Sequence, residues 1–370
     1  MWKKSVLFLA DLAMILGQKI KAEASDLTKE FDFSKIDEVL QEFMPEEKTD
    51  FEEVIQMLIK GEMEHPVELM KKVIKDQLFY EVRVNKKNIQ IMLLICIVAA
   101  VFTNFSKVFQ NEQITQIGFY MLYLLILSSG LSVFHVILNC AEDHLKFLAD
   151  FMKALGPVYF LAVSISFGSA TSVMFYNLVL FLIYLVEMLV LNFLLPFTHI
   201  FIVVKLLNRL SLEESLSRLA DLLEFLILWT LKTLLAGIIG LNLIQSMILP
   251  AMDSLKRSML TKGMEAVPVV GDALGGTAKV AAGTAILIKN GLGAAGALIC
   301  IMIWVIPVIK IFVITVLYKM AAALVQPVSD QRLVLCISEI ADAGQIVLKI
   351  VFTMGILFLI TIAVITTVTT

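Results

Sequence analysis

The chain has 370 residues, of which 59% are apolar and only 17% are charged, and its net charge is −3. A soluble domain carries about 25% charged residues, so this chain has too few polar side chains to cover a water-facing surface, and its charge gives no support for nucleic-acid binding. The composition predicts an all-α, polytopic helical membrane protein.

The first segment of the chain, residues 1–24, has the pattern of a secretory signal peptide. Lys3 and Lys4 form a basic start, a short apolar run follows, and Ala22-Glu-Ala24 has the form of a cleavage site. Asp11 lies inside the apolar run, where a charge is costly, and it keeps an uncleaved anchor open as the alternative. We take the orientation of the chain from this segment, because the charges of the later loops conflict.

Residues 25–88 differ in composition, with 10 Lys/Arg and 16 Asp/Glu, and they predict a small soluble helical domain outside the cytoplasm. Ser34 suits a helix start, the Asp50–Glu53 spacing is typical of a capping box, and Pro66 suits a first helical position. The apolar stripes of these helices indicate a small core, with a partner-binding groove as the alternative.

Residues 89–370 contain apolar runs that are long enough to cross a bilayer, which needs about 20 residues. We expect Pro196 and Pro307 to kink or split the two longest runs, which gives seven or eight transmembrane helices. The runs lie near 89–108, 116–138, 156–175, 178–204, 225–249, 292–325 and 345–368.

Two connecting segments have distinct patterns. Residues 205–224 place leucines on one face and charges on the other, which predicts an amphipathic helix at the membrane interface or against a partner. Residues 264–297 are a linker rich in Gly and Ala, in which Gly271 and Gly275 permit close approach of another backbone. This linker briefly imitates a phosphate loop, but Thr277 stands at the position of the essential lysine, so we expect no nucleotide site.

A few charged residues within the apolar runs are candidate structural or pathway residues. Glu187 lies deep in a run, where a carboxylate indicates function or pairing with another helix. Lys310 and Lys319 favour a buried or pore-facing position, but a continuous helix would place them on opposite sides. Gln326-Pro327 is a further candidate, with a simple helix stop as the favoured alternative.

Catalysis has almost no support in the sequence. The four cysteines form no C-x-x-C pair, and the histidines share no ligand spacing. H-E-x-x-H and G-x-S-x-G are both absent. We therefore expect a protein that is not an enzyme and has no metal and no cofactor.

The order and spacing of several short motifs between about 150 and 370 resemble the stage III sporulation protein AE family of endospore-forming bacteria. The motif Leu287-Ile-Lys-Asn-Gly291 adds Lys289 to the candidate residues. The other motifs are Phe151-Met-Lys-Ala-Leu-Gly-Pro157, Val267-Pro-Val-Val-Gly271 and Tyr318-Lys-Met-Ala-Ala-Ala-Leu-Val-Gln-Pro327.

This resemblance implies a component of the membrane complex that links mother cell and forespore, placed in the mother-cell membrane around the forespore. It implies as partners other stage III sporulation membrane proteins and a secretion-type ATPase, with a homo-oligomer left open. The leading hypothesis is a scaffold or conduit subunit. The alternative is a secondary transporter, for which the Gly- and Pro-interrupted region 264–327 would have to supply a broken helix.

Overall fold

The computed structural model describes residues 31–43, 50–60, 66–108, 112–166, 169–210, 215–264 and 271–368, and the structural statements below concern these residues. The predicted signal segment 1–24 lies outside them. The described residues form helices and short turns and include no strand, which confirms the all-α class. In chain order the elements are α2 (Ser34–Phe43), α3 (Phe51–Lys60), α4 (Pro66–Val108), α5 (Glu112–Ser166), α6 (Ser169–Leu185), the π-helix η1 (Val186–Leu194), α7 (Leu195–Leu210), α8 (Ser217–Met264), α9 (Gly271–Val325) and α10 (Gln331–Val368).

Six helices of the described part of the chain are long and apolar enough to cross a membrane, so the protein is a multi-pass membrane protein. The number differs from the seven or eight spans predicted, because the second apolar run and most of the third lie within one helix, α5. At 55 residues, α5 is about 80 Å long, well over the roughly 30 Å of a hydrocarbon core.

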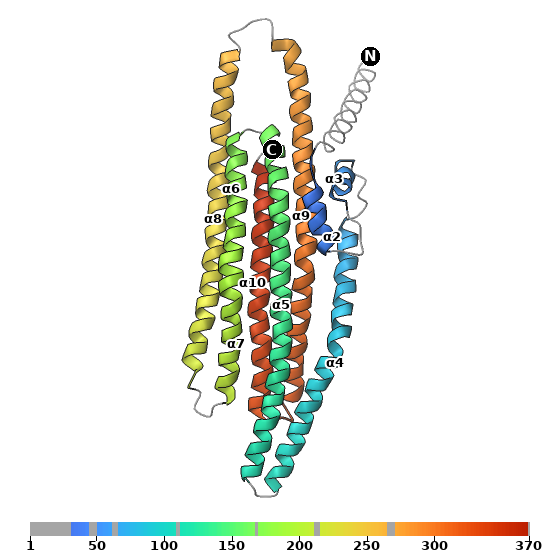
Figure 1. Cartoon of the computed structure of the whole chain (residues 1–370), viewed down its shortest axis with the longest axis vertical. Coiled ribbons are helices and arrows are strands. Elements are labelled where there is room, and N and C mark those ends of the chain that lie inside the picture. The colour runs from blue at the N-terminus through green and yellow to red at the C-terminus, as the bar shows by residue number, and fades with distance from the viewer. Residues whose placement is uncertain are drawn as a thin grey trace, which may run out of the picture.

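The long helices run side by side along the long axis of the molecule, and successive spans alternate in direction (Figure 1). α5 lies at the centre, where it contacts α4, α6, α9 and α10, and α8 covers α6, α7 and α10. At the lower end in Figure 1 the α4–α5 hairpin extends beyond the ends of the other helices. One continuous hydrophobic core joins all these elements.

The N-terminal helices α2 and α3 pack on this bundle instead of forming a separate core. Ile36 of α2 and Ile55 of α3 are fully buried, and the ring of Phe51 meets Phe151 of α5 edge to face at 6.5 Å. α4 runs without interruption past residue 88, so the helix passes directly from the predicted soluble segment into the first span.

The predicted amphipathic helix over 205–224 is divided between two antiparallel helices in the structure. α7 ends at Leu210 and α8 begins at Ser217. The side-chain oxygen of Asn208 accepts a hydrogen bond from the amide of Leu216 at 2.8 Å, which satisfies a donor at the start of α8. The segment therefore does not form one interfacial helix, and Leu207, Leu219 and Leu222 of its leucine face are exposed.

The two prolines expected to disturb helices have different effects. Just before Pro196 the chain forms the π-helix η1, and the amide of Leu195 bonds the carbonyl of Val190. This five-residue step lies next to the proline, whose missing N–H interrupts the α-helical pattern. Pro307 lies inside α9 without ending it, and the Gly-rich stretch from residue 271 to 297 is the first half of the same helix.

Some glycines permit the close packing of these helices. At Gly355 of α10, a Cβ atom would overlap the indole ring of Trp304 of α9, and this indole donates a hydrogen bond to the Val351 carbonyl at 3.1 Å. By contrast, a Cβ atom at Gly237 of α8 would meet nothing within 4 Å. The close contact between α9 and α10 therefore depends on the missing side chain at Gly355.

Candidate functional site

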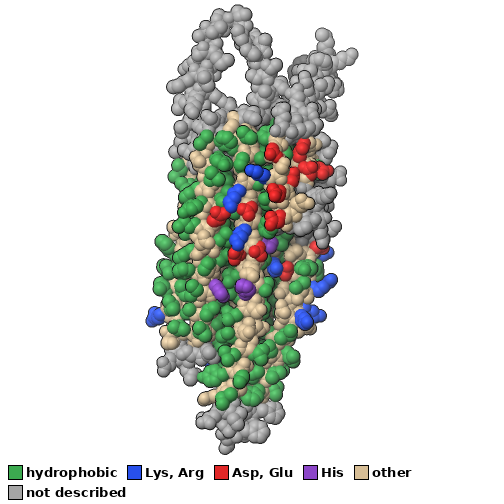
Figure 2. All heavy atoms as spheres, in the orientation of Figure 1, with side chains coloured by type: hydrophobic (Ala, Val, Ile, Leu, Met, Phe, Trp, Pro, Cys, Tyr) green, Lys and Arg blue, Asp and Glu red, His purple; other side chains and the backbone are tan. Residues whose placement is uncertain are grey.

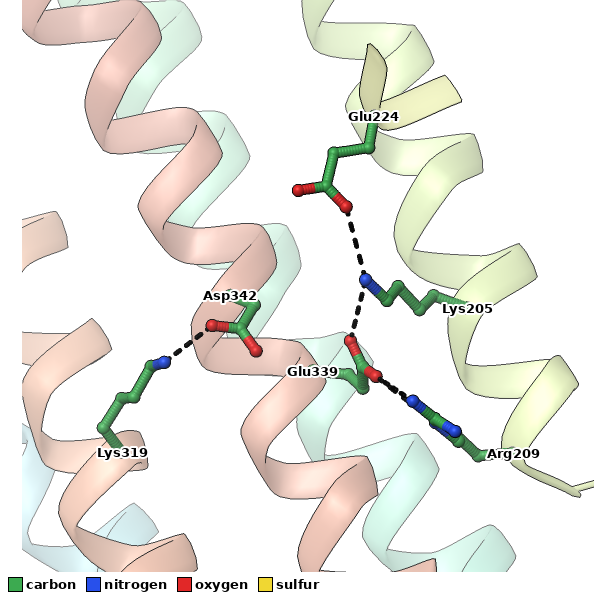
Figure 3. A network of polar contacts seen from close by, with 6 residues as sticks. All are labelled: Lys205, Arg209, Glu224, Lys319, Glu339 and Asp342. Atoms are coloured by element: carbon green, nitrogen blue, oxygen red, sulfur yellow. Dashed lines mark hydrogen bonds and ion pairs between the residues drawn. The ribbon is translucent and has the colours of Figure 1, made fainter. Parts of the chain in front are cut away.

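The most buried ion pairs of the described residues centre on Glu339 of α10, whose side chain is 7% exposed (Figure 3). Arg209 of α7 donates to Oε1 of this carboxylate from Nη2 at 2.8 Å and from Nε at 3.2 Å. Lys205, one turn earlier on α7, lies 3.3 Å from Oε2 and 3.4 Å from a carboxylate oxygen of Glu224 on α8. Two cations thus face two carboxylates, and the group is neutral.

This group, which we call the Glu339 cluster (Lys205, Arg209, Glu224 and Glu339), joins three helices that are distant in sequence. A buried carboxylate is tolerated when it is paired and hydrogen-bonded, and Glu339 has both kinds of partner. The hydroxyl of Tyr123 on α5 donates to the Leu206 carbonyl at 2.7 Å, which places α5 beside the same turn of α7. The cluster and the Tyr123 hydrogen bond together fix the relative positions of four helices.

A second ion pair lies one turn further along α10. Asp342 accepts from Lys319 of α9 at 2.7 Å, and both side chains are about 40% exposed (Figure 3). Lys319 thus has a partner in the structure, and it points to α10. The pair is more exposed than the Glu339 cluster, so its contribution to stability is smaller.

Glu187, the predicted intramembrane carboxylate, lies in the first turn of η1 and pairs with α5. Lys153 donates to it at 2.5 Å and to Asp150 at 3.1 Å. The side chains of Glu187 and Lys153 are 45% and 43% exposed. This position matches the helix-paired alternative, on a part of the surface that includes further charged residues of α5.

Lys310 of α9 lies near a polar cluster of α4. Glu81 of α4 is 3% exposed and accepts hydrogen bonds from Gln77 at 3.0 Å and Asn85 at 3.1 Å. Lys310 lies within electrostatic range of Glu81 and of His144 on α5. Lys310 and Lys319 therefore face different helices from the two sides of α9.

The remaining candidates have mainly structural environments. Gly271 and Gly275 lie in the first turns of α9, and their surroundings are outside the described side chains. Lys289 is fully buried in α9. Gln326 and Pro327 lie in the turn between α9 and α10, which is the simple helix stop that we favoured from the sequence.

Sequence reasoning did not single out the Glu339 cluster. From the sequence, Lys205 and Arg209 are only positive charges of the segment 205–224, and no pattern singles out Glu339. One pattern in the sequence could have indicated this cluster. Lys205 and Arg209 are four residues apart, so they lie on one face of a helix, and the end of the apolar run that they follow has no acidic residue. Such a pair needs acids from other helices.

The charged groups described above are mostly paired with one another. Within the described ranges, no group of three or more His, Cys, Asp and Glu side chains could hold a metal ion. The four cysteines are buried, which makes them poor nucleophiles. What the structure offers is a set of paired charges inside a membrane bundle, together with a charged outer face.

Comparison with known proteins gives two matches. A family model described as stage III sporulation protein AE matches residues 49–369. The chain is also similar to the stage III sporulation protein AE of Bacillus subtilis (strain 168), with 23% identity over 278 residues, which cover 75% of this chain and 69% of the relative. No solved structure matches the chain.

Proposed function

Since this chain belongs to the stage III sporulation protein AE family, which supports a role in sporulation, we propose that it is a scaffold or conduit subunit of a membrane complex connecting mother cell and forespore. Its place would be the mother-cell membrane around the forespore. Its partners would be other stage III sporulation membrane proteins and a secretion-type ATPase. The role is non-catalytic.

The observation that carries this proposal is an acidic surface fixed on the membrane bundle. We call it the α2–α3 acidic face, and acidic side chains gather over this region in Figure 2. Its exposed carboxylates are Asp32, Glu38, Glu42, Asp50 and Glu53.

This face is held firmly on its inner side. Ile59 and Ile55 of α3 lie over Gly291 of α9, and Phe33, just before α2, contacts Phe51 of α3 with ring centroids 5.5 Å apart. The side chain of Asp37 accepts a hydrogen bond from the Phe51 amide at 2.9 Å and so caps α3. A rigid charged surface is suited to docking a partner, because little conformational freedom is lost on binding.

The charge of the face indicates the chemistry of its partner. Carboxylates that stay solvated on an outer surface favour a partner segment rich in Lys and Arg, and complementary charge mainly increases the association rate and the specificity. A membrane component that carries such a face next to its spans can position a second protein at the bilayer, which is the function of a scaffold.

Affinity purification from sporulating cells tests this proposal. The wild-type chain should retain membrane and ATPase partners, and the double variant Glu38→Lys/Glu53→Lys should lose at least one of them while accumulating normally. Asp221→Lys is the matched control, since Asp221 is exposed on α8, away from this face. Equal recovery of partners with the double variant and the wild type would count against a docking role for this face.

The alternative is a secondary transporter, and one observation favours it. Transporter sites often use interrupted helices, and η1 interrupts the third span at the level of Glu187. The break expected in 264–327 is absent from the described part of this region, because α9 is continuous from Gly271 to Val325. Saturable solute flux by the lone reconstituted chain, unchanged by added partners, would favour the transporter.

A further inference from the structure

Polar and charged side chains follow one exposed face of α5 over several turns. They recur every three or four residues, which places them on one side of a helix. We call this set the α5 stripe: His135, Asn139, Glu142, Asp143, Lys146, Asp150 and Lys153. Figure 2 shows charged and histidine side chains along the middle of this face, with hydrophobic side chains toward α6–α8 and below.

Contacts with neighbouring helices fix the level of the stripe in the bundle. At one end, Leu155 of α5 lies over Gly296 of α9. At the other end, Ile137 of α5 and Thr315 of α9 both lie over Gly344 of α10. The charged part of the stripe therefore lies beside residues 297–314 of α9, which include one charged residue, Lys310.

At the same level, the outward side chains of the neighbouring helices are apolar. Three such side chains are about half exposed: Tyr184 at 56%, Met188 at 52% and Phe312 at 50%. Met188 directly follows Glu187, which pairs with Lys153 of the stripe. Apolar outward faces are what lipid contact requires. The stripe is thus a charged surface at the depth where the other helices face hydrocarbon.

Charged side chains at this depth need water or protein around them. Both lysines are paired within the chain, Lys146 with Glu142 at 2.6 Å and Lys153 with Glu187 at 2.5 Å and Asp150 at 3.1 Å, so the surface carries an excess of carboxylates and no unpaired lysine. The surface stays about half exposed. Water is the environment that suits it.

From this geometry we infer that the α5 stripe lines a water-filled lumen enclosed by several copies of this chain. One stripe covers one side of a lumen, and rotation of identical subunits about an axis repeats it around the whole wall with one type of interface. The stripe with Glu187 has four carboxylates and two lysines, so the lumen would favour cations. This inference deepens the proposed conduit function and rests on it.

Thiol labelling of the full chain reconstituted in liposomes tests the inference. Asp143→Cys and Asp150→Cys place thiols on the stripe, and Leu241→Cys places one on an apolar outward position of α8. Lys205 of α7 pairs with Glu224 of α8, so these two residues lie at one level of the bundle. Leu241 is 17 residues after Glu224, and Met188 is 17 residues before Lys205. Because the two helices run antiparallel, Leu241 lies near the level of Met188 and therefore of the stripe. The wild type gives the background, since its four cysteines are buried.

Methanethiosulfonate reagents react with the thiolate, which forms in water and not in hydrocarbon. We expect the two stripe variants to react at least about tenfold faster than Leu241→Cys, and faster with a cationic than with an anionic reagent. Native mass spectrometry of the same samples should show a closed oligomer. The wild type should show the same oligomer.

Three results would overturn the inference. The first is equal, slow labelling at the stripe and at Leu241, which places the stripe in lipid or protein. The second is fast labelling in a protein that is monomeric by mass. The third is fast labelling of the lone chain that is lost when the other sporulation membrane proteins are added, which makes the stripe a docking surface. None of these results depends on the α2–α3 acidic face, so the proposed docking function is tested separately.

Discussion

Two substitutions on α10 compare the energetic importance of a buried ion pair, that of Glu339, with that of an exposed one, that of Asp342. In Glu339→Gln, the amide replaces a carboxylate that accepts from Arg209 at 2.8 Å and lies 3.3 Å from Lys205. The Glu339 cluster then changes from neutral to a net charge of +1, with both cations facing an uncharged group. Asp342→Asn is the matched control, because it removes one charge one turn away.

The two changes should differ clearly in their effect on the free energy of unfolding. Removing one partner of a buried ion pair costs about 3–5 kcal/mol. Because Lys205 and Arg209 stay 20% and 24% exposed and Gln can still accept one hydrogen bond, we expect about 3 kcal/mol for Glu339→Gln. Asp342→Asn breaks a pair that is about 40% exposed on both sides, and it should cost about 0–1 kcal/mol.

Unfolding in mixed micelles, with increasing sodium dodecyl sulfate and far-UV circular dichroism as the signal, measures both values. The double variant Glu339→Gln/Arg209→Gln restores neutrality and should be more stable than Glu339→Gln alone, which would show coupling between the two sites. Equal losses for Glu339→Gln and Asp342→Asn would refute the reasoning, because burial would then not determine the cost.

Three further predictions concern packing, capping and orientation. Gly355→Ala should destabilise the protein by about 1–3 kcal/mol, because the new methyl group overlaps the packed tryptophan ring, while Gly237→Ala should be neutral or stabilising by up to about 1 kcal/mol; the same unfolding assay decides. Asp37→Ala should lose the cap on Phe51 and weaken α3 by about 0.5–2 kcal/mol. Burial raises the pKa of Asp37, so the neutral carboxyl favours the folded state, and this stability is present below the ordinary pKa and lost as the pH rises through the raised one. Asn stays neutral, and its side-chain oxygen can still accept a hydrogen bond from the Phe51 amide. At pH 7 the α3 amides of Asp37→Asn should therefore exchange no faster than those of the wild type. Glu38→Cys should react with an impermeant thiol reagent when the chain is expressed in growing cells, whose membrane borders the medium, and reaction only after lysis would show that this face lies in the cytoplasm.

The class of helical membrane protein could be predicted from the sequence, because a long apolar run in a bilayer must satisfy its own backbone hydrogen bonds and therefore forms a helix. The sequence also predicted that Pro196 kinks or splits its run, and pairing with another helix was one of the alternatives for Glu187. In the structure these features adjoin, with η1 placing Glu187 against Lys153.

The partners of the charged residues did not follow from the sequence. Arg209 and Glu339 are 130 residues apart, and their contact depends on how α7 and α10 are aligned by packing along their whole lengths. The α5 stripe was missed for a related reason. Except for His135, its residues lie between the second and third predicted spans, 116–138 and 156–175, so they belong to none of the apolar runs.

The π-helix η1 has a consequence for variation in this part of the chain. A π turn contains one residue more than an α turn, so side chains before it are rotated by about 100° relative to an uninterrupted α-helix. Deleting one residue within Val186–Leu194 would remove this extra residue, restore an α-helical turn and rotate all of α6 relative to α7. Tyr184, which is now 56% exposed, would then turn toward the interior, and a buried neighbour would turn outward. A one-residue gap here therefore changes which side of a whole helix faces the surroundings, while a gap in the turn between α9 and α10 changes the turn alone.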